Sequence, residues 1–356
     1  MDSERLRFSD LSDHHFQRWQ QLREQSAALA SPFFSPRYFQ VISQFRKETE
    51  VLVLSRGGRI EGFLPFEQRG RIAYPAGAEV SEITGCVTGD ATTFDLASVL
   101  ASHGIAGWVF DCVDSRQAWI QPWAYAFHQF RQIDLSCGME HYCKQQKRQG
   151  SKAVEGIQRK RRKLERERGG LHFCRHDNSD EAFEWLLQWK RAQYQRTGVT
   201  DVLSIPWVEA TLRFLKDDQP PDRLGGISSL RVNQQIVATA FWLGEGGRTH
   251  LWFPTYCPKF AKYSPGQILL LSLIEDAART GERHVIELGQ GDERYKLSLG
   301  NQIVHVAEGL VTNQPIRFHT RKLRTHLRIW AEKNPACQVP LRMLRRRKSY
   351  RLRNQT

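Results

Sequence analysis

Two short segments between residues 260 and 300 combine turn-forming residues with reactive side chains. The first is Tyr263-Ser264-Pro265-Gly266, which is followed by Gln267 and an apolar run that predicts a helix. A helix that starts after a Pro-Gly turn has free backbone N–H groups and a partial positive charge, which suit a phosphate group. We expect Tyr263, Ser264, Gly266 and Gln267 to bind the phosphates of a cofactor. Alternatively, Pro265-Gly266 only starts a helix.

The second segment follows that helix and reads Glu-Leu-Gly-Gln-Gly-Asp-Glu-Arg-Tyr-Lys from Glu287 to Lys296. It predicts a short strand, a glycine-rich turn and a Tyr-Lys pair. In α/β sheets, ligands bind beyond the carboxyl ends of parallel strands. The two segments together therefore indicate a phosphorylated cofactor with chemistry beside it.

The bulk composition fits a soluble protein with two packed cores. The chain has 356 residues, of which 40% are hydrophobic, and its polar N-terminus lacks the apolar core of a signal peptide. We expect no membrane span and a cytoplasmic location. Seven scattered cysteines predict reduced thiols. His172, Cys174 and His176 would share one face of a strand, but we expect a packed strand there and no metal.

Two basic segments carry the whole excess of positive charge. Residues 317–356 contain 13 Lys or Arg and one acid, and residues 144–168 contain 11 Lys or Arg and three acids. The rest of the chain is mildly acidic. Such segments are either solvated helix faces or surfaces for anionic partners such as nucleic acid, a membrane or a phosphorylated substrate.

The two halves of the chain predict the same order of elements. Each half has three strands, a helix and a fourth strand, with an offset of 176 residues that relates Asp111 to Glu287. The alternative is two unrelated α/β units. The predicted strands are 51–55, 59–66, 71–74 and 107–113, then 228–232, 236–243, 248–253 and 284–288, and the helices are 92–103 and 266–280.

We expect four parts along the chain. They are an N-terminal domain (1–145), a basic helical linker (146–168), a C-terminal domain (169–316), and a basic helix and tail (317–356). A further helix is expected over residues 181–196, with Asn178 or Ser179 as its N-cap. Leu323, Leu327 and Trp330 have helical spacing in the last part.

Four motifs resemble those of the CelD/BcsL-type family, a branch of the GNAT acyltransferases related to the FemAB aminoacyl transferases. The likeness covers about residues 30–300, and two residues depart from the pattern: Glu287 stands where Asp is usual, and Gln290 where a basic residue is common. The motifs are Ser31-Pro32-Phe33-Phe34-Ser35-Pro36, Phe63-Leu64-Pro65-Phe66, Tyr263-Ser264-Pro265-Gly266 and Gly289-x-Gly291-Asp292-x-x-Tyr295-Lys296.

The resemblance implies an α/β fold with a mixed sheet, built from tandem GNAT-like acyltransferase domains. It implies acetyl-CoA or another acyl-CoA as cofactor, and an amino sugar or surface polysaccharide precursor as acceptor. The cofactor arm would lie where strands 249–253 and 284–288 part. The first half, with Asp111 in the place of Glu287, would be a non-catalytic copy.

Direct transfer to an amine needs a base for its proton and an acid for the departing thiolate. Asp292 and Glu287 are candidate bases, and Asp292 is better placed because it lies at the open end of the strand. Tyr295 is the candidate acid, and Lys296 would stabilise the carbonyl oxyanion. Alternatively, Asp292 caps the next helix, Glu287 is structural, Tyr295 is core and Lys296 is solvated.

Two other functions remain open. A FemAB-like transferase would use aminoacyl-tRNA, held by the basic segment 144–168. A non-enzymatic adaptor would bind nucleic acid or a membrane through the tail, and the cations between Arg345 and Arg353 would hold the chain at the inner face of a membrane.

Overall fold

The computed structural model describes residues 1–89, 94–219 and 223–334, so the predicted tail cluster Arg345–Arg353 lies outside the described residues. The chain forms two compact units. Unit 1 contains residues 1–129 and the described residues from Val304 onward, and unit 2 contains Phe130–Ile303. The chain passes between the units within strands β7 (Ala124–Asp134) and β13 (Gln302–Val311).

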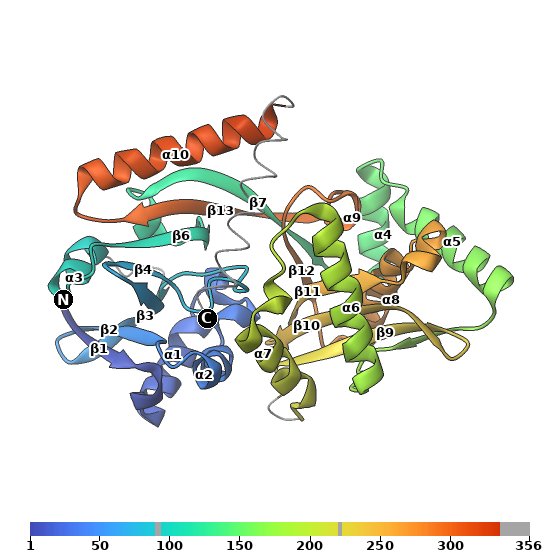
Figure 1. Cartoon of the computed structure of the whole chain (residues 1–356), viewed down its shortest axis with the longest axis horizontal. Helices are drawn as coiled ribbons and strands as arrows, with labels where there is room; N and C mark the ends of the chain where they lie inside the picture. The colour runs from blue at the N-terminus through green and yellow to red at the C-terminus, as the bar shows by residue number, and fades with distance from the viewer. Residues whose placement is uncertain (90–93, 220–222, 335–356) are drawn as a thin grey trace. The chain divides into compact units, whose positions relative to one another are not determined.

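The sheet of unit 1 is mixed (Figure 1). Its strand order is β1-β2-β3-β4-β6-β13, and β5 pairs with β3. The β4–β6 pair is parallel, and the other described pairs are antiparallel. The remaining strands are β1 (Asp2–Arg7), β2 (Glu50–Arg56), β3 (Arg59–Arg69), β4 (Ile72–Pro75), β5 (Val87–Thr88) and β6 (Gly107–Asp114).

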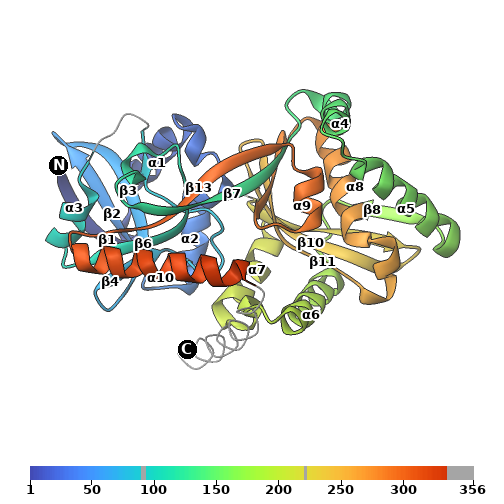
Figure 2. The same ribbon diagram turned by 90° about the horizontal axis from the view of Figure 1, so that it is seen from above.

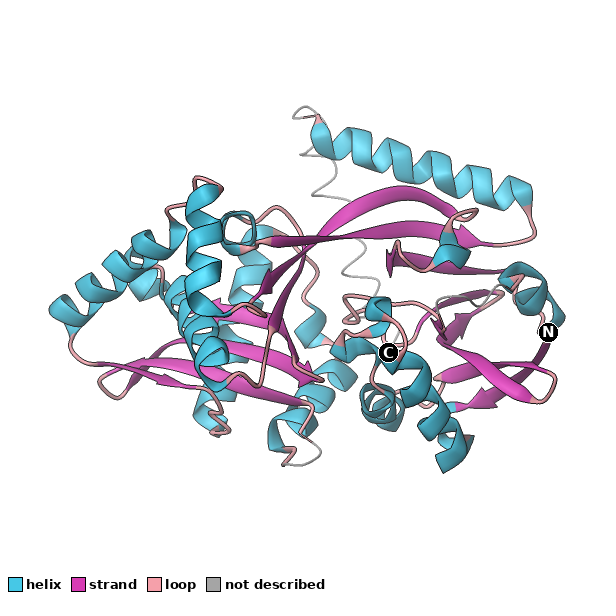
Figure 3. Ribbon diagram, turned by 180° about the vertical axis from the view of Figure 1, so that it is seen from behind, coloured by secondary structure: helices cyan, strands magenta, loops and turns pink. Residues whose placement is uncertain are grey.

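Helices cover both faces of this sheet because alternate strand residues are apolar on each side. One face packs Trp108 and Phe110 of β6 against Leu96 and Leu100 of α3. On the other face, α10 lies along β13, β7 and β6, as the long helix in Figure 3 shows. The helices of unit 1 are α1 (Asp13–Glu24), α2 (Pro36–Phe45), α3 (Leu96–Ser102) and α10 (Pro315–Lys333).

The sheet of unit 2 is also mixed. The end of β7 pairs antiparallel with β12, β12 pairs parallel with β11, and β11-β10-β9-β8 continue antiparallel. Its strands besides β7 and β13 are β8 (Leu171–Cys174), β9 (Gly225–Val232), β10 (Gln235–Glu245), β11 (Arg248–Tyr256) and β12 (Val285–Gln290).

Helices α6 and α7 cover one face of this sheet, and α8 covers the other with α5 packed on it (Figure 2). Helix α8 is apolar on nearly all sides because it lies between the sheet and the helices α4 and α5. The helices of unit 2 are α4 (Gly138–Arg148), α5 (Ala153–Arg168), α6 (Asp180–Thr197), α7 (Pro206–Asp217), α8 (Pro265–Thr280) and α9 (Arg294–Leu299).

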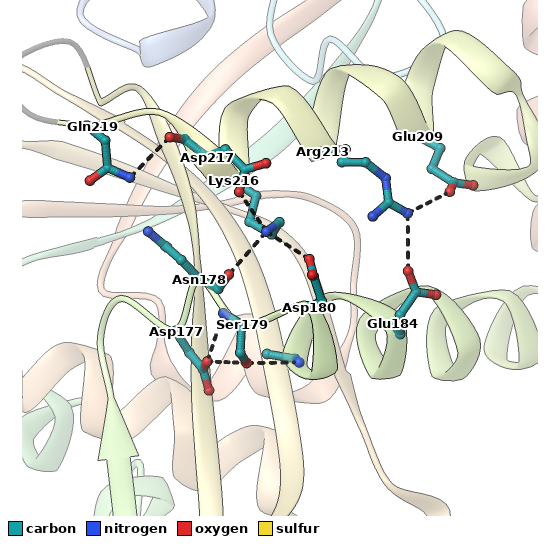
Figure 4. A network of polar contacts seen from close by, with 11 residues as sticks. Asp177, Asn178, Ser179, Asp180, Glu184, Glu209, Arg213, Lys216, Asp217 and Gln219 are labelled. Atoms are coloured by element: carbon teal, nitrogen blue, oxygen red, sulfur yellow. Dashed lines mark hydrogen bonds and ion pairs between the residues drawn. The ribbon is translucent and has the colours of Figure 1, made fainter.

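Polar contacts join the start of α6 to α7 (Figure 4). The Lys216 ammonium group donates to the Asn178 carbonyl at 3.1 Å and to the Asp180 carboxylate at 3.2 Å. Arg213 of α7 likewise bridges Glu184 of α6 and Glu209 of its own helix. The predicted cap at Ser179 is confirmed, since its hydroxyl accepts from the Ala182 N–H. These bonds join α6 to α7.

The predicted α/β fold with mixed sheets is confirmed, and each predicted strand is present within a few residues of its expected bounds. The two units also share one irregularity. Strand β6 has one extra residue within Asp111–Cys112 opposite β13, and β12 has one at Leu288 opposite β7. The offset of 176 residues relates Cys112 to Leu288. The repeat therefore extends to the position of a β-bulge.

Three further features concern the described residues only. No helix among them is long and apolar enough to cross a membrane. They also contain no group of three or more metal-ligating side chains, and His176 instead lies edge-on to Trp242 with ring centroids 5.3 Å apart. The basic stretch 144–168 forms two helices, α4 and α5, rather than one.

Candidate functional site

The start of α8 has an unusual backbone. A 3-10 helix (Pro258–Tyr263) leads to Ser264, whose φ of 55° is left-handed, and Pro265 opens α8. The Ser264 carbonyl accepts from the N–H groups of Gln267 and Ile268. The Gln267 N–H thus donates within the turn, and the binding of a phosphate by Gln267 stays a prediction. Gly266 retains a first-turn N–H for a ligand.

Helix α5 places a cation at this helix start. The Lys160 ammonium group donates to the Ser264 hydroxyl at 2.7 Å. Arg161, the next residue, instead pairs with Glu275 of α8 at 2.8 Å. An ammonium group beside the positive end of a helix is unfavourable without an anion, so the pair suits a negatively charged ligand. The sequence placed the basic segment between domains and gave no sign of this contact.

Tyr263 is buried and ties the end of α5 to this turn. Its hydroxyl donates to the Glu167 carboxylate at 2.6 Å. This hydrogen bond is the main reason that the pKa of Glu167 lies below its usual value. Tyr256 of β11 lies on the other side of the turn, with its ring 3.4 Å from the position of a Cβ on Gly266. The start of α8 thus lies between α5 and an aromatic ring.

Strands β11 and β12 part beside this turn. Their parallel ladder has three residue pairs and ends at His250 and Glu287, although β11 continues to Tyr256 and β12 to Gln290. The predicted divergence of these two strands is confirmed. Their facing edges can hydrogen-bond an extended ligand as a further strand would.

A buried ionisable pair marks the last rung of the ladder. The Glu287 carboxylate lies 3.2 Å from His250 Nδ1 and 3.4 Å from Arg248, and both His250 and Glu287 are excluded from solvent. These contacts favour the structural role that the sequence allowed for Glu287. Sequence reasoning missed His250, because only the strand register brings it opposite a residue 37 positions later.

The turn after β12 displays Asp292 to solvent. Gly289 and Gly291 have φ values of 80° and 118°, so the turn requires glycine at both positions. Asp292 is exposed, and the N-cap of α9 is Glu293. The alternative that Asp292 caps α9 is therefore wrong. Its carboxylate is open to an acceptor.

Tyr295 and Lys296 lie on α9. Tyr295 is half-buried, and Lys296 is buried rather than solvated. The Lys296 ammonium group donates to the Gln290 carbonyl at the end of β12 and lies 3.2 Å from the Glu293 carboxylate. Lys296 therefore fixes the glycine-rich turn. The Ser151 hydroxyl donates to the Ser298 carbonyl, so the chain at the start of α5 also contacts α9.

Unit 1 has a closed counterpart of this site. Its parallel pair β4–β6 ends after Ile72–Gly107 and Ala73–Trp108. Beyond it, Thr84 forms a parallel bridge with Val113, and its N–H donates to the Cys112 carbonyl at 2.8 Å. The described residues of unit 2 form no such bridge to β12. At the corresponding helix, the Asp95 side chain caps α3 by accepting from Ala97 and Ser98.

The comparison with known families addresses this region. Residues 151–297 match a family model described as an acetyltransferase (GNAT) domain. This segment contains α5, the start of α8, both parting strands, Asp292 and Lys296. The matched segment is similar to acetyltransferase domains of the GNAT type. The chain is thus an enzyme of the acyltransferase class, as the sequence predicted. No curated protein matches the chain in sequence.

Solved structures extend the fold similarity over most of the chain. The C-terminal domain of a putative lysylphosphatidylglycerol synthetase from Agrobacterium fabrum shares 12% identity with a TM-score of 0.52, covering 87% of this chain and 94% of that chain. FemX shares 10% identity, with a TM-score of 0.52 and coverages of 90% and 100%. L-PGS from Bacillus licheniformis shares 14% identity, with a TM-score of 0.51 and coverages of 88% and 96%. At these identities the likeness concerns the fold.

Proposed function

We propose that unit 2 transfers an acyl group from acetyl-CoA, or another acyl-CoA, to the amine of an amino sugar or a surface polysaccharide precursor. The contact between Lys160 and Ser264 at the start of α8 carries this proposal. It offers a cation, a hydroxyl and the Gly266 N–H to a pyrophosphate, next to the parted strands. The resemblance to the CelD/BcsL-type family supports the same class of acceptor.

The residues around the ends of β11 and β12 have different roles in the proposed acyl transfer. Acyl-CoA supplies a thioester, and the edges of β11 and β12 hold its amide-bearing arm. Asp292 removes the proton of the attacking amine as the C–N bond forms. Tyr295 protonates the sulfur as the C–S bond breaks. Lys296 holds the turn that carries Asp292, and Glu287 with His250 keeps the two strands joined below the site.

The test is a calorimetric titration with acetyl-CoA and free CoA. Lys160→Met removes the ammonium group and keeps most of the side-chain length. We expect roughly ten- to hundredfold weaker binding, because hydrogen bonds to charged groups contribute about 1.5–3 kcal/mol.

Lys163→Met on the same helix is the matched control. Lys163 is exposed, and its ammonium group lies 3.9 Å from Glu167. Equal losses of affinity in the two variants would mean that the net charge of α5 causes the effect, and would contradict a phosphate site at Lys160 and Ser264. Retention of full affinity by Lys160→Met would do the same.

Use of aminoacyl-tRNA is the second candidate, because α5 exposes a row of cations. The exposed basic residues are Lys152 at its N-cap and Arg159, Arg162, Lys163, Arg166 and Arg168 within the helix. Binding through such a face weakens steeply with salt, since each neutralised phosphate releases counterions. Fluorescence anisotropy with labelled tRNA over a salt series measures this. Salt-sensitive tRNA binding without acetyl-CoA binding would replace the first proposal by the second.

A further inference from the structure

Helix α10 is attached to unit 1 by one face. Phe318 and Ile329 pack against the apolar cluster of Val109, Tyr125, Ala126 and Leu310. The Thr325 hydroxyl and the Arg328 guanidinium group both donate to the Glu308 carboxylate of β13. These contacts fix which side of α10 faces the sheet.

The opposite side of α10 is apolar and exposed. Four large side chains recur at intervals of seven, four and three residues, so they form one stripe along the helix. Their exposed fractions are 84% for Ile316, 61% for Leu323, 55% for Leu327 and 58% for Trp330. An amphipathic helix normally turns its apolar side toward the core. Here a second apolar side faces outward, which indicates a partner.

Basic residues flank this stripe on both sides. Lys322 and His319 lie on one flank, and Arg317 and Arg324 lie on the other. Glu332 is the one acidic residue within α10, and residues 335–356, which follow directly, contain seven Lys or Arg and no acid. The surface around the stripe therefore complements an anionic partner.

We propose that α10 docks unit 1 on an anionic lipid surface, with its axis in the plane of the membrane. Ile316, Leu323, Leu327 and Trp330 would enter the boundary between headgroups and acyl chains, and the flanking cations would contact the headgroups. This pattern, with Trp and Leu on one side and Lys or Arg beside them, is typical of interfacial helices. The proposal goes beyond acyl transfer and does not depend on it.

Charge argues against the other occupants. A second copy of the chain would bring two sets of flanking cations together, because a twofold interface pairs identical surfaces. A nucleic acid would satisfy the cations but leave the apolar stripe without contacts. A lipid surface satisfies both features.

The test is sedimentation of the full chain with vesicles of phosphatidylcholine alone or mixed with phosphatidylglycerol. We expect binding to the mixed vesicles that decreases with salt. Leu327→Asp should weaken it about tenfold or more, because it places a charge where a leucine would enter the membrane. Val199→Asp in unit 2 is the matched control, since Val199 is 49% exposed and the charge change is the same.

Three outcomes would overturn the proposal. The first is no sedimentation with either vesicle. The second is equal binding of both variants, which would assign the effect to net charge alone. The third is a concentration-dependent dimer that Leu327→Asp dissolves, without lipid binding. Melting temperatures verify that each variant is folded.

Discussion

The two units contain corresponding pairs of parallel strands, but among the described residues only the pair in unit 1 is followed by a bridge to a further segment. In unit 1, Thr84 forms a parallel bridge with Val113 beyond the end of the β4–β6 ladder, and its N–H donates to the Cys112 carbonyl. In unit 2, the β11–β12 ladder ends at Glu287, and the described residues provide no bridging segment. In unit 1 this bridge lies at the position that corresponds to the proposed place of the cofactor arm in unit 2.

The N-terminal ends of α3 and α8, which lie next to these strands, also differ in their side-chain contacts. The Asp95 carboxylate accepts from two N–H groups of α3, so a negative charge of the protein already occupies that helix start. At α8, Ser264 makes no side-chain cap, and Lys160 approaches instead. A repeated fold is therefore insufficient for a repeated site, because the local hydrogen bonds decide whether an anion can enter.

The largest expected effect concerns Asp292. Asp292→Asn should lower the rate constant for acyl transfer by roughly 10²- to 10⁴-fold, because it removes the proposed base and leaves an exposed turn intact. Release of free CoA in the presence of amino sugars measures this. Glu282→Gln, at an exposed carboxylate that precedes β12, is the control and should retain most activity. An active Asp292→Asn enzyme would refute the assignment.

The next effect concerns the corresponding acids of the two strands. Glu287→Leu should lower the free energy of unfolding by about 3–5 kcal/mol, because it breaks a buried pair and leaves His250 without this carboxylate. Asp111→Leu, at the corresponding position of unit 1, should cost less than about 1 kcal/mol, because burial and the nearby Glu308 raise the pKa of Asp111 and make its charge unfavourable in the folded state. Urea denaturation compares them. Similar losses in the two variants would mean that the acids play equivalent roles.

Asp111 and Glu287 also show which features of the structure could be predicted from the sequence. Strand propensity and turn residues predicted the strands of both parallel pairs, and the 176-residue offset related Asp111 to Glu287. The sequence could not show that Glu287 meets His250, because that contact depends on strand register. Nor could it show Lys160 against Ser264, since the packing of α5 on α8 brings together residues 104 positions apart. Side-chain burial of Lys296 likewise follows from the turn geometry.

A smaller effect is expected when the bridge in unit 1 is removed. Thr84→Pro eliminates the N–H that donates to the Cys112 carbonyl and should cost about 1–3 kcal/mol of stability. Acetyl-CoA affinity should not change, because unit 2 binds it. Thr84→Val keeps the N–H and serves as the control. A gain of a second acetyl-CoA site in Thr84→Pro, measured by calorimetry, would show that the bridge alone closes unit 1.

The smallest effect concerns the two helix caps. Asp95→Ala should cost about 1 kcal/mol at neutral pH, whereas Ser264→Ala should cost little, since Ser264 makes no cap bond. Hydrogen bonding from Ser98 lowers the pKa of Asp95 below its ordinary value of 3.8. Its stabilising effect is therefore present above that pH and lost as the pH falls through the lowered pKa. Thermal melts at several pH values should therefore show that the melting temperatures of the unmodified protein and of Asp95→Ala converge as the pH falls.

Hydrogen exchange with and without acetyl-CoA tests most directly the claim that only unit 2 has an open site. We expect acetyl-CoA to slow exchange in peptides covering residues 251–256, 264–268 and 288–291. Peptides covering 76–88 and 107–114 of unit 1 should remain unchanged. Protection in the unit 1 peptides, or in neither set, would contradict the account.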